Sequence, residues 1–162
     1  PSAVVSALAV SGLPTGRFTF EGFLSVNKKS RREHLESLRD ETRTMVFYEA
    51  PHKLPYTLQD MEAVFGDRRI ALVREITKIH EQCIRTTLSA AAAHYASTPP
   101  KGEFVLVIEG AKPAEKREMT LEDAVALARA AMENGSAASD AAKEAAKLSG
   151  FKKGEIYKRL ME

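Results

Sequence analysis

The sequence of 162 residues has a single cysteine, Cys83, and no tryptophan. One cysteine excludes an intrachain disulfide, so we expect a reducing, cytoplasmic setting. No apolar run approaches the roughly 18 residues of a membrane-spanning helix, and no basic cluster of the signal-peptide kind opens the chain, so no membrane partner is expected. The 24 basic and 22 acidic residues leave a net charge of +2. This balance excludes a surface devoted wholly to phosphate and leaves local basic patches to consider.

Common catalytic and metal-binding signatures are also missing. The sequence has no G-x-S-x-G, no phosphate-binding glycine loop and no G-x-G-x-x-G, which removes the familiar hydrolase, kinase and dehydrogenase patterns. The four histidines are scattered, and His80 with Cys83 is too small a set for a zinc site. We therefore predict no metal.

What the chain does contain is an alternation of two hydrophobic periods over residues 1–110. Runs rich in β-branched and aromatic residues predict strands, and stretches with apolar residues three and four apart predict helices. The predicted strands are 17–23, 42–49, 69–76, 82–87 and 102–110, and the predicted helices are 1–12, 28–40, 54–65 and 88–95. Strands separated by helices indicate an α/β architecture with helices on the sheet faces, and Gly22 is expected to form a bulge.

The composition changes at 111–119, where Lys, Glu and Pro dominate. The predicted parts are an α/β domain at 1–112, a linker at 113–118 and a helical tail at 119–162. The tail predicts three short helices, the first capped by Thr120, the second by Ser139 and Asp140, with Gly150 in the last turn; this pattern resembles a helix-turn-helix. Its basic last helices suit nucleic acid, whereas its many alanines suit close packing or dimerisation, and the residues alone favour neither.

Polar residues follow three of the predicted strands, at Tyr48-Glu49, at Arg74 to Lys78 and at Gly102-Glu103. Ligands of open α/β sheets bind at the carboxyl ends of strands, so these residues are site candidates; a surface ion-pair group is the simpler reading of the spacing alone. The basic run Lys28-Lys29-Ser30-Arg31-Arg32 opens a predicted helix. It suits phosphate binding, or a solvated surface.

Six motifs in order carry a family resemblance. They are Pro1-Ser2-Ala3, Gly12-Leu13-Pro14, Phe20-Glu21-Gly22-Phe23, Phe47-Tyr48-Glu49-Ala50-Pro51-His52-Lys53, Arg74-Glu75-Ile76-Thr77-Lys78 and the run from Gly102 to Gly110. Together they resemble the small-subunit ribosomal RNA methyltransferases of the tetrapyrrole methylase superfamily. The resemblance implies a mixed sheet of about five strands flanked by helices, S-adenosylmethionine as cofactor, and methylation of a cytidine ribose 2′-hydroxyl. It also implies an upstream domain that holds much of the cofactor, so this C-terminal half is expected to be inactive alone.

The resemblance further assigns roles to single residues. Ser2, Ala3, Phe47, Tyr48 and Glu103 are expected to contact the cofactor. Lys28, Lys29, Arg31, Arg32, Arg74 and Thr77 are expected to bind the RNA substrate. Glu75, or a neutral Lys78, is expected to accept the proton of the hydroxyl.

The expected partners are small-subunit ribosomal RNA or the 30S subunit, and a second copy of the chain in a homodimer. Two other functions stay open. One is methylation of a tetrapyrrole, which gives the basic patches no use. The other is a non-enzymatic helix-turn-helix module that reads nucleic acid.

Overall fold

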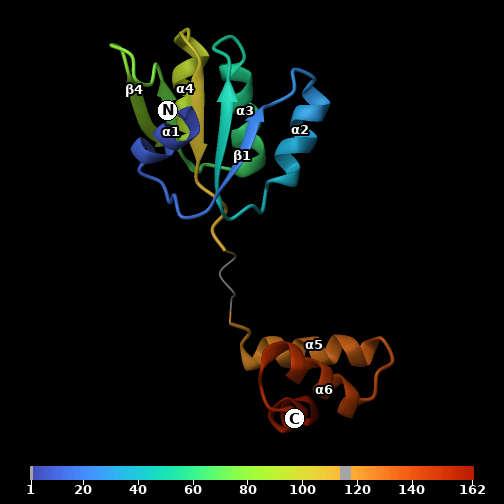
Figure 1. Ribbon diagram of the computed structural model, residues 1–162. Helices are drawn as coiled ribbons and strands as arrows, with labels where there is room; N and C mark the ends of the chain where they lie inside the picture. Colours follow the sequence, from blue (N-terminus) through green and yellow to red (C-terminus); the bar gives the residue numbers. More distant parts are fainter. Residues whose placement is uncertain (1, 114–117) are drawn as a thin grey trace. The chain divides into compact units, whose positions relative to one another are not determined.

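The computed structural model describes residues 2–113 and 118–162; residues 114–117 of the predicted linker lie outside this description. The chain divides into two compact units, residues 1–113 and 114–162, each treated by itself below (Figure 1). Within the described residues, no helix is long and apolar enough to cross a bilayer. The same residues hold no group of three or more His, Cys, Asp or Glu side chains placed to bind a metal ion.

The first unit alternates helices and strands, as the hydrophobic pattern predicts. Its elements are α1 (Ala3–Ser11), β1 (Phe18–Phe23), α2 (Lys28–Ser37), β2 (Thr44–Glu49), α3 (Leu54–Phe65), β3 (Arg69–Arg74), β4 (Gln82–Thr87), α4 (Leu88–Ser97) and β5 (Phe104–Ile108). Each overlaps an element predicted from the sequence.

The five strands form one mixed sheet in the order β1-β2-β5-β3-β4, which confirms the predicted fold class. β1 and β2 are parallel, whereas β5 runs antiparallel to both of its neighbours, β2 and β3. β1, β2 and β3 therefore point the same way, and their carboxyl ends share one edge of the sheet with the start of β5.

Successive side chains of β2 enter two separate cores because strand residues alternate between the faces of a sheet. Met45 and Phe47 pack with α2, α3 and α4 on one face, and Val46 packs under α1 on the other (Figure 1). The five residues of β5 are all buried, as expected for a central strand covered on both faces.

β1 is an edge strand whose aromatic side chains remain partly exposed. Phe18, Phe20 and Phe23 are 40%, 53% and 55% exposed. The helix on this face of the sheet, α1, covers β3, β4 and β5 and does not extend over β1. The pairing of β1 with β2 shifts between Phe20 and Gly22, which confirms the predicted bulge. Gly22 has a φ of +66°, a conformation that glycine adopts without steric cost.

Residues 118–162, the described part of the second unit, form three helices, α5 (Leu121–Glu133), α6 (Ala138–Ser149) and α7 (Lys153–Met161). Thr120 caps α5 through a reciprocal pair of hydrogen bonds with Asp123. α6 begins one residue earlier than its predicted cap, with Ala137 at the N-cap, so Ser139 lies inside the first turn. The core is built mainly from alanines of α5 and α6 together with Ile156 of α7, so these two helices approach each other closely.

Candidate cofactor and substrate site

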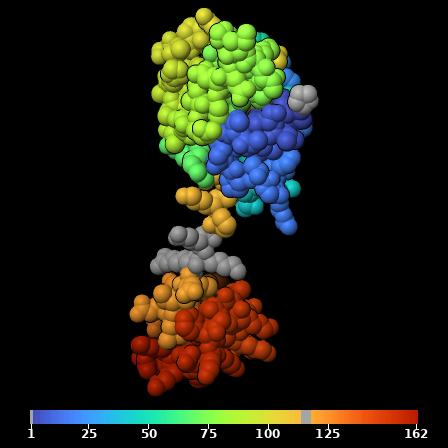
Figure 2. All heavy atoms as spheres, turned by 60° about the vertical axis from the view of Figure 1, so that its left-hand side comes forward, coloured from blue at the N-terminus to red at the C-terminus, as the bar shows by residue number. Residues whose placement is uncertain are grey.

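A cavity of about 600 Å³ opens where the parallel strands end. It is bounded by the ends of β1, β2 and β3, by the start of β5 and by the first residue of α1. Its lining residues are Ala3, Phe23, Tyr48, Val73, Arg74, Glu75, Ile76, Lys78, Gly102, Glu103, Phe104 and Val105. This is the edge of an α/β sheet where ligands commonly bind. Figure 2 shows the segment around the start of β4, in green, beside α1, in blue.

Three of the five residues expected to contact a cofactor line this cavity, namely Ala3, Tyr48 and Glu103. Ser2 is exposed at the N-cap of α1, and its carbonyl accepts a hydrogen bond of 3.0 Å from the amide of Ser6. Phe47 lies elsewhere. Its side chain is completely buried in the core on the face opposite Tyr48, so it is not available to a ligand in the cavity, and that expectation needs correction.

The loop after β3 holds two non-glycine residues with positive φ, Glu75 at 55° and Thr77 at 66°. Such backbone conformations cost about 1 kcal/mol or more and concentrate at functional sites. The carboxylate of Glu75 and the ammonium of Lys78 form an ion pair of 3.3 Å. Thr77 is exposed and does not line the cavity; its amide donates to the carboxylate of Glu81 at 3.0 Å, which holds the loop.

Arg74 ties this loop to the segment before β5. Its Nε donates to Oε1 of Gln82 at 2.7 Å, and its Nη1 donates to the carbonyl of Lys101 at 2.9 Å. The guanidinium therefore fixes the walls of the cavity relative to each other. Arg74 lines the cavity, with two of its donors engaged within the chain.

Gly102 lies directly against the carboxylate of Glu75. A Cβ added at Gly102 would lie 2.7 Å from Oε1 of Glu75, closer than Cβ atoms approach other atoms. Gly102 also has a φ of +75°. A side chain at this position would therefore displace the Glu75 carboxylate and would also adopt an unfavourable backbone conformation.

An aromatic cluster forms one wall of the cavity. The rings of Phe20 and Phe23 meet the ring of Tyr48 edge to face, with centroids 5.1 and 5.6 Å apart. Phe23 was expected to be a strand residue but not part of the site. The signal for its role is the bulge at Gly22, which turns Phe23 to the same face as Phe20 and Tyr48.

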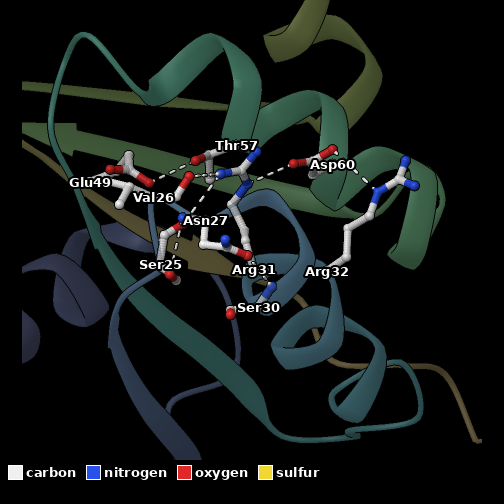
Figure 3. Close-up of polar contacts among 9 residues, drawn as sticks. All are labelled: Ser25, Val26, Asn27, Ser30, Arg31, Arg32, Glu49, Thr57 and Asp60. Carbon is white, nitrogen blue, oxygen red and sulfur yellow. Dashed lines mark hydrogen bonds and ion pairs between the residues drawn. The ribbon is translucent and has the colours of Figure 1, made fainter.

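The basic run at the start of α2 lies outside the cavity and separates into two parts. Lys28, Lys29 and Arg32 are exposed. Arg31 points inward, where its Nε donates to Asp60 of α3 at 2.7 Å and its Nη1 donates to the carbonyls of Ser25 and Val26 (Figure 3).

The side chains of Arg31 and Asp60 are only 13% and 11% exposed. The expectation that Arg31 binds substrate is therefore wrong for the structure of this chain, because its guanidinium is committed to three internal acceptors. The signal was readable in the sequence, since Arg31 lies one helical turn before the buried Leu35.

Glu49 is a second polar residue that serves the fold. It is 1% exposed and accepts a hydrogen bond of 2.7 Å from the hydroxyl of Thr57 (Figure 3). It also accepts a hydrogen bond from the amide of Ala50. Glu49 thus joins the end of β2 to α3 behind the cavity, while its neighbour Tyr48 faces the cavity.

The fold and the strand-end cavity define an α/β protein with a candidate ligand site at the carboxyl ends of its parallel strands. A family model described as "Tetrapyrrole (Corrin/Porphyrin) Methylases" matches residues 1–92, more than half of the chain. The chain belongs to this family.

The curated relatives carry a more specific name. The chain is 40% identical over 162 residues to the ribosomal RNA small subunit methyltransferase I of Synechocystis sp.. The match covers 99% of this chain and 58% of that protein. It is 45% identical over 123 residues to the protein of the same name from Xylella fastidiosa, covering 74% of this chain and 45% of the relative. The chain therefore spans about half the length of the curated relatives it matches.

Among solved structures, the chain resembles the methyltransferase CobJ with a TM-score of 0.52 and 19% identity. The match covers 68% of this chain and 48% of that chain. At this identity the likeness shows the fold alone.

Proposed function

We propose that this chain is part of an S-adenosylmethionine-dependent methyltransferase that modifies a cytidine 2′-hydroxyl in small-subunit ribosomal RNA. The observation that carries the proposal is the strand-end cavity, which brings Tyr48, Glu75, Lys78 and Glu103 together. The name of the curated relatives supports RNA as the substrate. We further propose that the chain is inactive alone, because its relatives are about twice as long.

The residues of the cavity fit the proposed cofactor. The rings of Tyr48 and Phe23 offer apolar surface to an adenine. The carboxylate of Glu103 suits ribose hydroxyls, and carboxylates in general favour the positive charge of a sulfonium. The first turn of α1, reached at Ala3, is free of side-chain capping and suits a carboxylate. When bound, S-adenosylmethionine supplies an electrophilic methyl group.

Glu75 is the residue we assign as the proton acceptor. When the ribose oxygen takes the methyl group, the bond from that carbon to the sulfonium sulfur would break and leave a neutral thioether, and the proton of the hydroxyl would pass to a carboxylate oxygen of Glu75. Lys78 in the ion pair is an ammonium, which has donors but no lone pair to accept a proton. Its role is to hold the Glu75 carboxylate in place and to offer a positive charge to the RNA.

The exposed cations Lys28, Lys29 and Arg32 form the basic patch of the first unit. We assign it a phosphate contact with RNA that orients the substrate, since such contacts position a nucleic acid without reading its sequence. A tetrapyrrole substrate is the second candidate, favoured by the description of the family. It would fill the same cavity but would leave this basic patch without a role.

The first experiment is a calorimetric titration of S-adenosylmethionine into this chain and into a two-domain protein carrying the upstream half of a relative. We expect binding only by the two-domain protein. Failure of both proteins to bind would contradict the assignment of the cavity.

Single-turnover methylation of small-subunit RNA by the two-domain protein tests the acceptor. Glu75→Gln should slow the rate constant about 100-fold or more, within the range of a lost general base. Glu62→Gln on α3, outside the cavity, is the matched control and should leave it unchanged. An unaltered rate in Glu75→Gln would remove the residue from the mechanism.

A further inference from the structure

α6 and α7 of the second unit are connected as a helix-turn-helix. Residues 150–152 join them, and Gly150 ends α6 with a φ of +79°, its amide donating to the carbonyl of Ala146. Ile156 is completely buried against the alanine-rich core, which fixes the rotation of α7 about its own axis. One face of α7 is therefore held inward and the opposite face is presented to solvent.

The charges of the second unit are segregated along the sequence. The segment 118–135, which contains α5, has four acidic residues and one basic residue. The segment 138–162, which contains α6 and α7, has six basic residues and four acidic ones. The α6–α7 segment thus has a net charge of +2 and the α5 segment a net charge of −3, so the excess of positive charge in these segments lies on the helix-turn-helix.

The outward face of α7 carries Gly154, Tyr157, Lys158 and Met161, which are spaced by three and four residues and are all exposed. Tyr157 is 40% exposed and Met161 57%. Within the described part of the chain, the Tyr157 ring pairs with no other aromatic ring, its hydroxyl forms no hydrogen bond, and Lys158 forms no ion pair. A partly exposed aromatic ring and an unpaired cation thus lie on the same face of α7.

Gly154 adds an independent observation. An added Cβ at this position would meet no atom within 4 Å, and its φ is outside the range that disfavours side chains. Gly154 is the second residue of α7, and its added Cβ would point into open space, so packing does not require a glycine here. Without a side chain, the helix backbone is accessible on the same face as Tyr157 and Lys158, where a polymer backbone can approach α7 closely.

We propose that this face of α7 binds RNA, with Tyr157 stacked on an unpaired base, Lys158 on a phosphate and the backbone seated over Gly154. Aromatic stacking combined with phosphate contacts is the usual way in which proteins hold single-stranded RNA. The choice of RNA rests on the proposed function. The surface is a second RNA contact, in a different unit from the strand-end cavity and the basic patch.

The test is fluorescence anisotropy of the whole chain with a labelled RNA stem-loop, at several KCl concentrations and without cofactor. Tyr157→Ala should weaken binding about tenfold with little change in the salt dependence, as for one lost stacked base. Lys158→Glu should weaken binding and lower the slope of log K against log salt by about one. Matched controls are Tyr56→Ala, an exposed tyrosine of α3, and Arg129→Glu on α5, which should both bind like the parent.

Gly154→Gln separates binding from folding. Its side chain should cover the exposed backbone at this position and weaken RNA binding at least fivefold, while the helix content by circular dichroism stays the same or rises. If Gly154 served only the fold, this variant would lose helix content and would bind RNA like the parent.

Parent-like binding by all three α7 variants would overturn the inference, as would equal loss in the two controls. Equal or tighter binding of duplex DNA of the same length, lost in the same variants, would overturn the assignment to RNA. The proposed function is tested separately, by methyl transfer in the two-domain protein. If reversing the charges of Lys28 and Arg32 abolished RNA binding while the α7 variants bound normally, the proposed function would stand and the α7 surface would be rejected.

Discussion

Among single residues, Gly102 has the most direct effect on the geometry of the candidate site, because the Glu75 carboxylate occupies the space that a side chain at position 102 would need. Gly102→Ala should destabilise the fold by about 1–2 kcal/mol through its positive φ alone. It should also displace the Glu75 carboxylate, whose Oε1 lies 2.7 Å from the added Cβ, and so slow methyl transfer in the two-domain protein.

Gly12→Ala is the matched control for that change. Gly12 has a similar φ of +72°, but its added Cβ meets Arg85 at an ordinary 3.5 Å. Urea denaturation should show a loss of stability in both variants, and methyl transfer should fall only in Gly102→Ala. Equal rates in the two variants would separate Gly102 from the reaction.

The single thiol gives a second prediction for one side chain. Burial raises the pKa of Cys83, and the nearby Arg85 offsets only part of this effect. Less thiolate is therefore present at pH 8 than for a free cysteine, and the thiolate is the reactive form. Alkylation by iodoacetamide should be at least about tenfold slower in the folded chain than in urea. Equal rates under both conditions would show that Cys83 is not protected.

At the scale of elements, the pair of Arg31 and Asp60 joins α2, α3 and the loop that follows β1. Asp60→Ala should destabilise the chain by about 2–3 kcal/mol, because it leaves the nearly buried guanidinium without its anion. Lys29→Ala is the control, since its pair with Glu33 is largely exposed and should contribute less than about 0.5 kcal/mol. Urea denaturation measures both. Similar losses of unfolding free energy in the two variants would show that the pair of Arg31 and Asp60 does not stabilise the fold.

The positions of helices and strands were predictable because each has a strong local pattern, such as the apolar run of β5. The strand order was not, because it depends on contacts between segments far apart in the chain. β5 lies between β2 and β3 in the sheet, although β4 and α4 separate β5 from β3 along the sequence. Which of Phe47 and Tyr48 faces the cavity follows from alternation only after one face has been assigned. That assignment required the position of α1.

For the α/β unit as a whole, three anionic contacts lie at the sheet edge opposite the cavity. Glu41 precedes β2, Asp67 precedes β3 and Glu109 follows the antiparallel β5. Hydrogen bonds from Arg43 lower the pKa of Glu41 to about 2. Hydrogen bonds with Ser89 lower the pKa of Asp67, and hydrogen bonds from Arg69 lower that of Glu109. Glu41 and Glu109 at this edge are thus paired with arginines, and the edge is distinct from the one that lines the cavity.

These lowered pKa values set the direction of the pH dependence. A carboxyl group whose pKa is lower in the folded chain contributes stability above its unfolded pKa of about 4, and that stability is lost as the pH falls through the folded pKa. The urea midpoint of the parent should therefore decline between about pH 4.5 and pH 2. The variant Glu41→Gln should be less stable than the parent at pH 6, with the difference vanishing near pH 2, whereas Glu62→Gln should match the parent throughout. A difference between Glu41→Gln and the parent that stayed constant from pH 6 to pH 2 would show that ionisation of Glu41 does not stabilise this edge.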